Sequence, residues 1–141
     1  MTETEFRVNH STVIEYYQYI EMRLKGICTA IYSNSMTDWF QRLNDYDGDP
    51  LGKLIQKIHV AQEEKIRIVF SAEEFNDLDR IRQARNFWCH QCFGGDFHII
   101  FKNGVVKQPE YAKKLVSDLR EAIEWDERLA NKHHELSSVW K

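Results

Sequence analysis

The scarcity of helix-breaking residues is the feature that most limits what this chain can fold into. Only two prolines, Pro50 and Pro109, and six glycines occur among 141 residues. Proline removes a backbone donor and glycine costs about 1 kcal/mol inside a helix, so a chain poor in both favours long helices. The length suits a single domain spanning residues 1–141. We therefore expect an all-α fold.

Apolar residues recur every three or four positions near the start of the chain. They predict an amphipathic helix from about Ser11 to Tyr32, with Ser11 or Thr12 placed to cap its first turn. A short helix is predicted from Met36 to Leu43. The stripe of the first helix comprises Val13, Tyr17, Ile20, Leu24, Ile27 and Ile31.

Glycine and proline mark a loop from Asp45 to Pro50, after which the apolar periodicity resumes. Because proline suits the first turn of a helix, another helix is expected to begin there, with Leu51 and Leu54 on its apolar side. The segment from Ile66 to Phe70 is too short and too apolar to distinguish a buried helix from an extended connector.

The clearest helix signal starts at Ser71. Ser71-Ala-Glu-Glu74 has the form of a capping box, in which the serine hydroxyl and the glutamate carboxylate each accept a free backbone N–H. One apolar row follows, and Gly94-Gly95 is expected to end the helix. The row comprises Phe75, Leu78, Ile81, Arg85, Trp88 and Cys92.

A small β-hairpin is predicted before the last helix. Phe97–Phe101 and Val105–Val106 flank Lys102-Asn103-Gly104, and Asn-Gly is a strong signal for a two-residue turn. The last helix is predicted from Pro109 toward Trp140. Its stripe comprises Leu115, Leu119, Ile123 and Leu129. The predicted architecture is an all-α, antiparallel helical bundle of about four to five helices, with the hairpin inserted before the last one.

Charge and cysteine content narrow the classes of function. Lys and Arg number 19 against 22 Asp and Glu, a net charge of −3, which argues against a surface that grips nucleic acid or an anionic membrane everywhere. No stretch approaches the length of a bilayer span. Three cysteines cannot all pair within one chain, and no signal peptide is recognised. A cytoplasmic protein without a membrane partner is expected.

Polar side chains form a stripe beside the apolar row of the Ser71 helix. At 100° per residue, Asn86 and His90 lie about 40° apart. Asp79 and Arg82 fall on the same side in the preceding turns. Arg85 lies between the polar and apolar faces, and its long side chain can swing toward the stripe.

The sequence Arg85-Asn86-Phe-Trp-Cys-His90 resembles the R-N-x-x-x-H motif of the HEPN superfamily of small helical-bundle proteins. Arg and His separated by four to six residues are a weak signal alone, since Arg128 and His133 also match, but only Arg85 is followed directly by Asn. The resemblance implies a homodimer in which two motif helices form one composite cleft. Many members are metal-independent RNases in toxin, antiviral or RNA-processing roles, so an antitoxin or defence-system partner is also implied.

The resemblance implies an endoribonuclease that needs neither metal nor cofactor. The 2′-OH of RNA would attack the adjacent phosphate, leaving 2′,3′-cyclic phosphate and 5′-OH ends. His90 is the candidate acid and base because imidazole titrates near pH 6.5. Arg85 would hold the phosphate and stabilise its growing charge. Asn86 would orient the His90 ring or the phosphate through hydrogen bonds. Arg80 and Arg82 are the candidate RNA-binding residues.

Each of these residues also has a structural interpretation. Arg82 and Arg85 could pair with Asp79 and neighbouring Glu on a solvated helix face, and for Arg82 this interpretation is favoured. The chain could also be a non-catalytic HEPN-like helical dimer that binds a nucleotide, RNA or a protein partner, which the negative net charge favours. Lys53 and Lys57 are further cations that could guide RNA.

The two cysteines beside the motif allow other chemistry. Trp88-Cys89-x-x-Cys92 is similar to a redox site, but Cys89 lies far from a helix N-terminus, where the thiol pKa would be lowered. A zinc site built on Cys89, Cys92 and His98 would lack a fourth ligand. Buried thiols are therefore the expected role of both cysteines.

Overall fold

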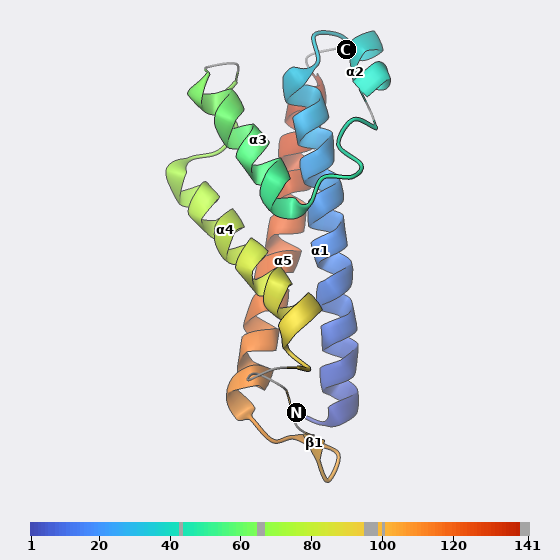
Figure 1. Ribbon diagram of the computed structural model, residues 1–141, viewed down its shortest axis with the longest axis vertical. Helices are drawn as coiled ribbons and strands as arrows, with labels where there is room; N and C mark the ends of the chain where they lie inside the picture. The colour runs from blue at the N-terminus through green and yellow to red at the C-terminus, as the bar shows by residue number, and fades with distance from the viewer. Residues whose placement is uncertain (43, 65–66, 95–98, 100, 139–141) are drawn as a thin grey trace.

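A computed structural model of the chain describes residues 1–42, 44–64, 67–94, 99 and 101–138. Helices dominate these ranges (Figure 1), and the predicted helical bundle with a hairpin before its last helix is confirmed. In chain order the elements are α1 (Glu3–Tyr32), α2 (Met36–Arg42), α3 (Leu51–Glu63), α4 (Ala72–Asn86), the π-helical turn η1 (Phe87–Gln91), β1 (Phe101–Lys102), β2 (Val105–Val106) and α5 (Pro109–Ser137).

The two longest helices, α1 and α5, lie side by side along the length of the molecule (Figure 1). At 1.5 Å per residue each spans roughly 45 Å. They run in the same direction: Arg23 Nε lies 3.3 Å from Asp126 Oδ1, and Gly26, one turn further along α1, faces His133, further along α5. The bundle axis is therefore set by this parallel pair.

The first helix extends further toward the N-terminus than predicted. Thr2 Oγ1 accepts the Glu5 N–H at 3.1 Å, and Glu5 Oε2 accepts the Thr2 N–H at 3.1 Å, which completes a capping box. Phe6 is fully buried and continues the apolar stripe into this added segment. The predicted caps, Ser11 and Thr12, therefore lie inside α1.

The helices α3 and α4 begin where predicted. α3 follows Pro50, and α4 follows Ser71, whose hydroxyl accepts the Glu74 N–H at 3.1 Å while Glu74 Oε1 accepts the Ser71 N–H at 3.1 Å. α4 then runs antiparallel to both α3 and α5 (Figure 1), as the predicted bundle requires. The motif, at the C-terminal end of α4, therefore lies toward the end of the bundle that holds the hairpin.

The connector before α4 is extended in its described part, residues 67–70. Gln62 holds it in place, because its Oε1 accepts the Val69 and Phe70 N–H groups at 2.9 and 2.7 Å and its Nε2 donates to the Phe70 carbonyl at 2.9 Å. Val69 and Phe70 are buried. This resolves the choice that the sequence left open, although Ile66 lies outside the described residues.

The hairpin turn matches the prediction at Asn103-Gly104. Both residues have positive φ, 54° and 72°, as a type I′ turn requires, and asparagine and glycine tolerate this conformation. The hairpin also packs against the start of α1, since the Gly104 carbonyl accepts the Glu3 N–H at 2.8 Å and the Met1 carbonyl accepts the Val106 N–H at 3.1 Å. The N-terminus of α1 is therefore tied to the segment that follows the motif.

The last helix begins with Pro109 in its first turn, as predicted. Its buried face differs from the predicted stripe at Ile123, which is 42% exposed because Ala122 and Trp125 take the core positions one residue before and two after it. The predicted strand positions 97, 98 and 100 and the predicted extension of this helix to Trp140 lie outside the described residues. No helix in the described ranges is both long enough and apolar enough to cross a bilayer.

Candidate functional site

The motif lies where α4 passes into the π-helical turn η1. Leu78, Ile81, Trp88 and Cys92 are buried, which confirms most of the predicted apolar row. Arg85, which the prediction placed in the same row, is only half-buried because its neighbour Ala84 occupies the core position. Arg85 therefore lies at the boundary between the buried and the polar side of α4.

The π turn corrects the prediction of one continuous α-helix up to Gly94. The Cys92 N–H donates to the Phe87 carbonyl at 2.9 Å, an i to i−5 bond, so one extra residue is accommodated in the turn. Angles of 100° per residue therefore hold up to Asn86 but not as far as His90. π turns of this kind occur frequently at functional sites.

The three predicted catalytic side chains are accessible at this junction. Arg85 and Asn86 are half-buried on α4, and His90 is exposed on η1. Among the described residues, no side-chain hydrogen bond or ion pair engages any of the three. Arg85 lies close enough to Cys89 that its positive charge opposes the rise in the Cys89 pKa that partial desolvation causes. Within the part of the chain that the structure describes, a guanidinium, an amide and an imidazole are therefore available to contact a ligand.

Trp88 anchors the turn that carries His90. Its indole Nε1 donates to Asp118 Oδ2 on α5 at 2.7 Å, and Lys114 Nζ donates to the same oxygen at 2.6 Å. On the other side, His10 Nε2 of α1 lies 2.8 Å from the Trp88 carbonyl oxygen. Sequence reasoning missed His10 because it placed the start of α1 after this residue.

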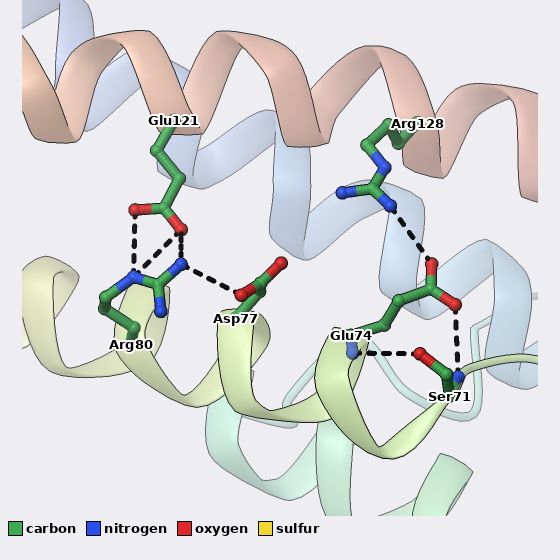
Figure 2. A network of polar contacts seen from close by, with 6 residues as sticks. All are labelled: Ser71, Glu74, Asp77, Arg80, Glu121 and Arg128. Atoms are coloured by element: carbon green, nitrogen blue, oxygen red, sulfur yellow. Dashed lines mark hydrogen bonds and ion pairs between the residues drawn. The ribbon is translucent and has the colours of Figure 1, made fainter.

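Arg80, a predicted RNA-binding residue, is engaged at the junction of α4 and α5 (Figure 2). Its Nη2 lies 2.6 Å from Glu121 Oε1 and 2.9 Å from Asp77 Oδ1, and its Nε lies 3.1 Å from Glu121 Oε1. These bonds to Glu121 and Asp77 raise the pKa of Arg80 further above its ordinary value. An RNA phosphate would have to compete with two carboxylates for this guanidinium.

The other predicted RNA-guiding cations are also paired. Arg82 Nη2 lies 2.9 Å from Asp79 Oδ1, the structural interpretation that the sequence favoured for it. Lys53 and Lys57 both contact Asp49, and the hydrogen bond from Lys57 is the main cause of the lowered pKa of Asp49. These cations of α3 and α4 are therefore partly neutralised by neighbouring carboxylates. Within the motif itself, the cationic residue is Arg85.

A second carboxylate connects α4 to α5 near the start of α4 (Figure 2). Glu74 completes the capping box and also approaches Arg128 Nη2 at 3.5 Å and Lys132 Nζ at 3.7 Å. Local sequence predicted the capping role of Glu74. Its contacts with α5 join residues 54 positions apart or more and have no local signal.

The prediction that Cys89 and Cys92 are both buried thiols is correct only for Cys92. Cys28 and Cys92 are buried, and desolvation raises their pKa values to about 12 and about 11. Cys89 is exposed, which corrects the prediction for this residue. His98, the third residue of the zinc alternative, lies outside the described part of the chain. Within that part, no three His, Cys, Asp or Glu side chains gather as metal ligands.

Comparison of the chain with models of protein families, with curated proteins and with solved structures found no match.

Proposed function

We propose that the chain is a metal-independent endoribonuclease of the HEPN type that acts as a homodimer. One observation carries the proposal. Arg85, Asn86 and His90 belong to one six-residue motif at the α4–η1 junction, are accessible, and have no side-chain hydrogen bonds or ion pairs to other described residues. Arg80 and Arg82, which lie on the same helix, have carboxylate partners instead.

The chemistry follows from the three groups. One His90 accepts the proton of the ribose 2′-OH as the 2′ oxygen attacks phosphorus. The bond from phosphorus to the 5′ oxygen then breaks, and a protonated His90 from the second copy gives its proton to that oxygen. Arg85 pairs with the phosphate oxygens as their charge grows, and Asn86 orients the phosphate or the imidazole. The products are a 2′,3′-cyclic phosphate and a 5′-OH.

Cleavage of an end-labelled RNA by purified variants tests the proposal. His90→Ala and Arg85→Ala are each expected to lose about 100-fold or more in kcat/KM, the usual contribution of an acid–base or charge-stabilising group. Matched controls are His134→Ala at the far end of α5 and Arg120→Ala, an exposed arginine of α5. Both are expected to retain activity within about twofold of wild type.

Further measurements distinguish this mechanism from metal-dependent cleavage and from cleavage by a monomer. Activity should persist in excess chelator, and the 3′ ends should resist phosphatase until mild acid opens the cyclic phosphate. Light scattering should give twice the mass of the chain. Equal cleavage by wild type and His90→Ala would overturn the proposal. So would cleavage that stops when the metal is removed.

The biological part of the proposal is a cytoplasmic toxin or phage-defence nuclease that a partner protein restrains. Induced expression of wild type, but not of His90→Ala at equal protein level, should arrest growth and degrade cellular RNA. Equal growth arrest by both proteins would contradict a nuclease toxin.

A second function is supported by a different observation, namely the pairing of Arg80, Arg82, Lys53 and Lys57 with carboxylates. A surface with its cations neutralised in this way suits a non-catalytic HEPN-like dimer that binds a nucleotide, RNA or a protein partner. Fluorescence anisotropy with labelled RNA distinguishes the two functions. Tight RNA binding without cleavage would favour the binding module, whereas cleavage that depends on His90 favours the nuclease.

A further inference from the structure

The π turn changes which donors make hydrogen bonds to the backbone carbonyls around the motif. In an α-helix the Cys92 N–H would donate to the Trp88 carbonyl, four residues back. Here the same N–H donates to the Phe87 carbonyl at 2.9 Å. The Trp88 carbonyl therefore loses the donor that a regular helix would provide, and a buried acceptor without a donor is costly.

His10 of α1 takes the place of that donor. Its Nε2 lies 2.8 Å from the Trp88 carbonyl oxygen, and because a carbonyl can only accept, a hydrogen bond here requires the tautomer with its hydrogen on Nε2. Cys92 Sγ also lies 3.3 Å from this oxygen, but a thiol is a weak donor. The imidazole N–H is thus the principal replacement for the missing helical bond.

The His10 ring is held in position by aromatic neighbours. It stacks on Phe6 with centroids 6.4 Å apart and meets Phe93 edge-on at 5.1 Å and Trp88 at 6.1 Å. The Trp88 indole is fixed independently by its bond to Asp118. Trp88, two residues before His90, is therefore held by hydrogen bonds on two sides. Its carbonyl contacts α1 and its side chain contacts α5.

We propose that His10 is a positioning residue that locks the π turn and thereby sets where the His90 imidazole points. If the turn relaxed to an α-helix, the Cys92 N–H would return to the Trp88 carbonyl. The residues after Phe87 would then rotate about the helix axis by up to one residue step, roughly 100°. His90 would then change its position relative to Arg85 and Asn86, which precede the turn. The catalytic part of this proposal rests on the nuclease function proposed above, whereas the structural part does not.

Two amide variants of His10 test the lock. The His10→Gln side chain can place an N–H donor near the position of imidazole Nε2, whereas the chemically similar His10→Asn is shorter and cannot reach the carbonyl. His10→Asn is expected to lower kcat for RNA cleavage about tenfold or more with KM within about threefold, because misplacement of a reacting group affects the chemical step. His10→Gln is expected to restore kcat to within about threefold of wild type.

The reactivity of Cys89 reports the geometry of the turn without any need for nuclease activity. Cys89 is exposed and directly precedes His90, whereas Cys28 and Cys92 are buried. The rate at which Cys89 reacts with a disulfide reagent is expected to change about threefold or more in His10→Asn and to stay near the wild-type value in His10→Gln. Cys89→Ser identifies the signal by abolishing it.

The outcomes are distinguishable. Absence of RNA cleavage by the wild type would overturn the proposed function, while the Cys89 rates would still decide whether His10 locks the turn. Unchanged Cys89 rates in a folded His10→Asn would overturn the lock. Changed rates with unchanged kcat would overturn its role in positioning His90. If His10→Asn does not fold, ¹⁵N spectra of the wild-type ring decide the matter: an Nε2–H tautomer supports the lock, and an Nδ1–H tautomer overturns it.

Discussion

Replacing Gly26 by alanine tests how closely α1 and α5 pack. A Cβ at this position would lie 2.8 Å from Cε1, 3.0 Å from Nε2 and 3.1 Å from Nδ1 of the His133 ring. Carbon atoms in van der Waals contact are about 3.5–4.0 Å apart, so the ring would have to move. Glycine is therefore required here for the approach of a neighbouring side chain and not for a special backbone conformation.

Two opposing contributions set the size and sign of the effect. Alanine is more favourable than glycine in a helix interior by about 1 kcal/mol. Overpacking a close contact typically costs about 1–3 kcal/mol. Since three ring atoms are approached at once, we expect the cost to exceed the gain and Gly26→Ala to lower the free energy of unfolding by about 1 kcal/mol. In a His133→Ala background the close contact is gone and only the difference in helix propensity remains. Gly26→Ala should then raise the free energy of unfolding by about 1 kcal/mol.

Urea unfolding of the four proteins at pH 8, followed by circular dichroism, measures this double-mutant cycle. The expected coupling between the two positions is about 2 kcal/mol. Gly48→Ala is the control, since a Cβ there would meet nothing within 4 Å, and it should change stability by about 0.5 kcal/mol or less. Equal stabilisation by Gly26→Ala in both backgrounds would refute the packing of His133 on Gly26.

Two further predictions concern stability. Burial, aided by the charge of Arg23, lowers the pKa of His133 below its ordinary 6.5. The unfolded chain therefore takes up the proton first, and the free energy of unfolding should fall as the pH drops through about 6.5. His133→Gln should flatten this decline in urea titrations from about pH 8 to 5.5, and an unchanged slope would contradict the assignment. Trp88→Phe removes the donor to Asp118, whose side chain is only 12% exposed, and should cost about 1–3 kcal/mol. Trp39→Phe should cost less, because its buried indole N–H has no hydrogen-bond partner among the described residues; equal losses would contradict the role of the bond.

Most helix starts were predictable because their signals are local. The capping box of Ser71 and Glu74 involves residues three positions apart, and Pro50 and Pro109 act within a single turn. The start of α1 was predicted wrongly for a different reason. Its own capping box, Thr2 with Glu5, is equally local, but the apolar periodicity from Val13 onward outweighed it.

The candidate site was predictable as a set of residues but not as a geometry. Arg85, Asn86 and His90 lie within one short stretch, so their motif is visible in the sequence. The π turn between Asn86 and His90 is not, because it depends on a donor from His10, 78 positions away. The arithmetic of a regular helix therefore located the motif but could not give the direction of the imidazole.

The sequence by itself determined the helical class, the hairpin turn and the place of the motif, since each follows from hydrogen bonds and side-chain periodicity among residues a few positions apart. Only the tertiary structure decided that α1 and α5 run in the same direction. It alone decided that Arg80 is held by Glu121, and that a π turn displaces His90 from the α-helical register. These features depend on contacts between residues 41 to 103 positions apart, which form only when the helices pack against one another.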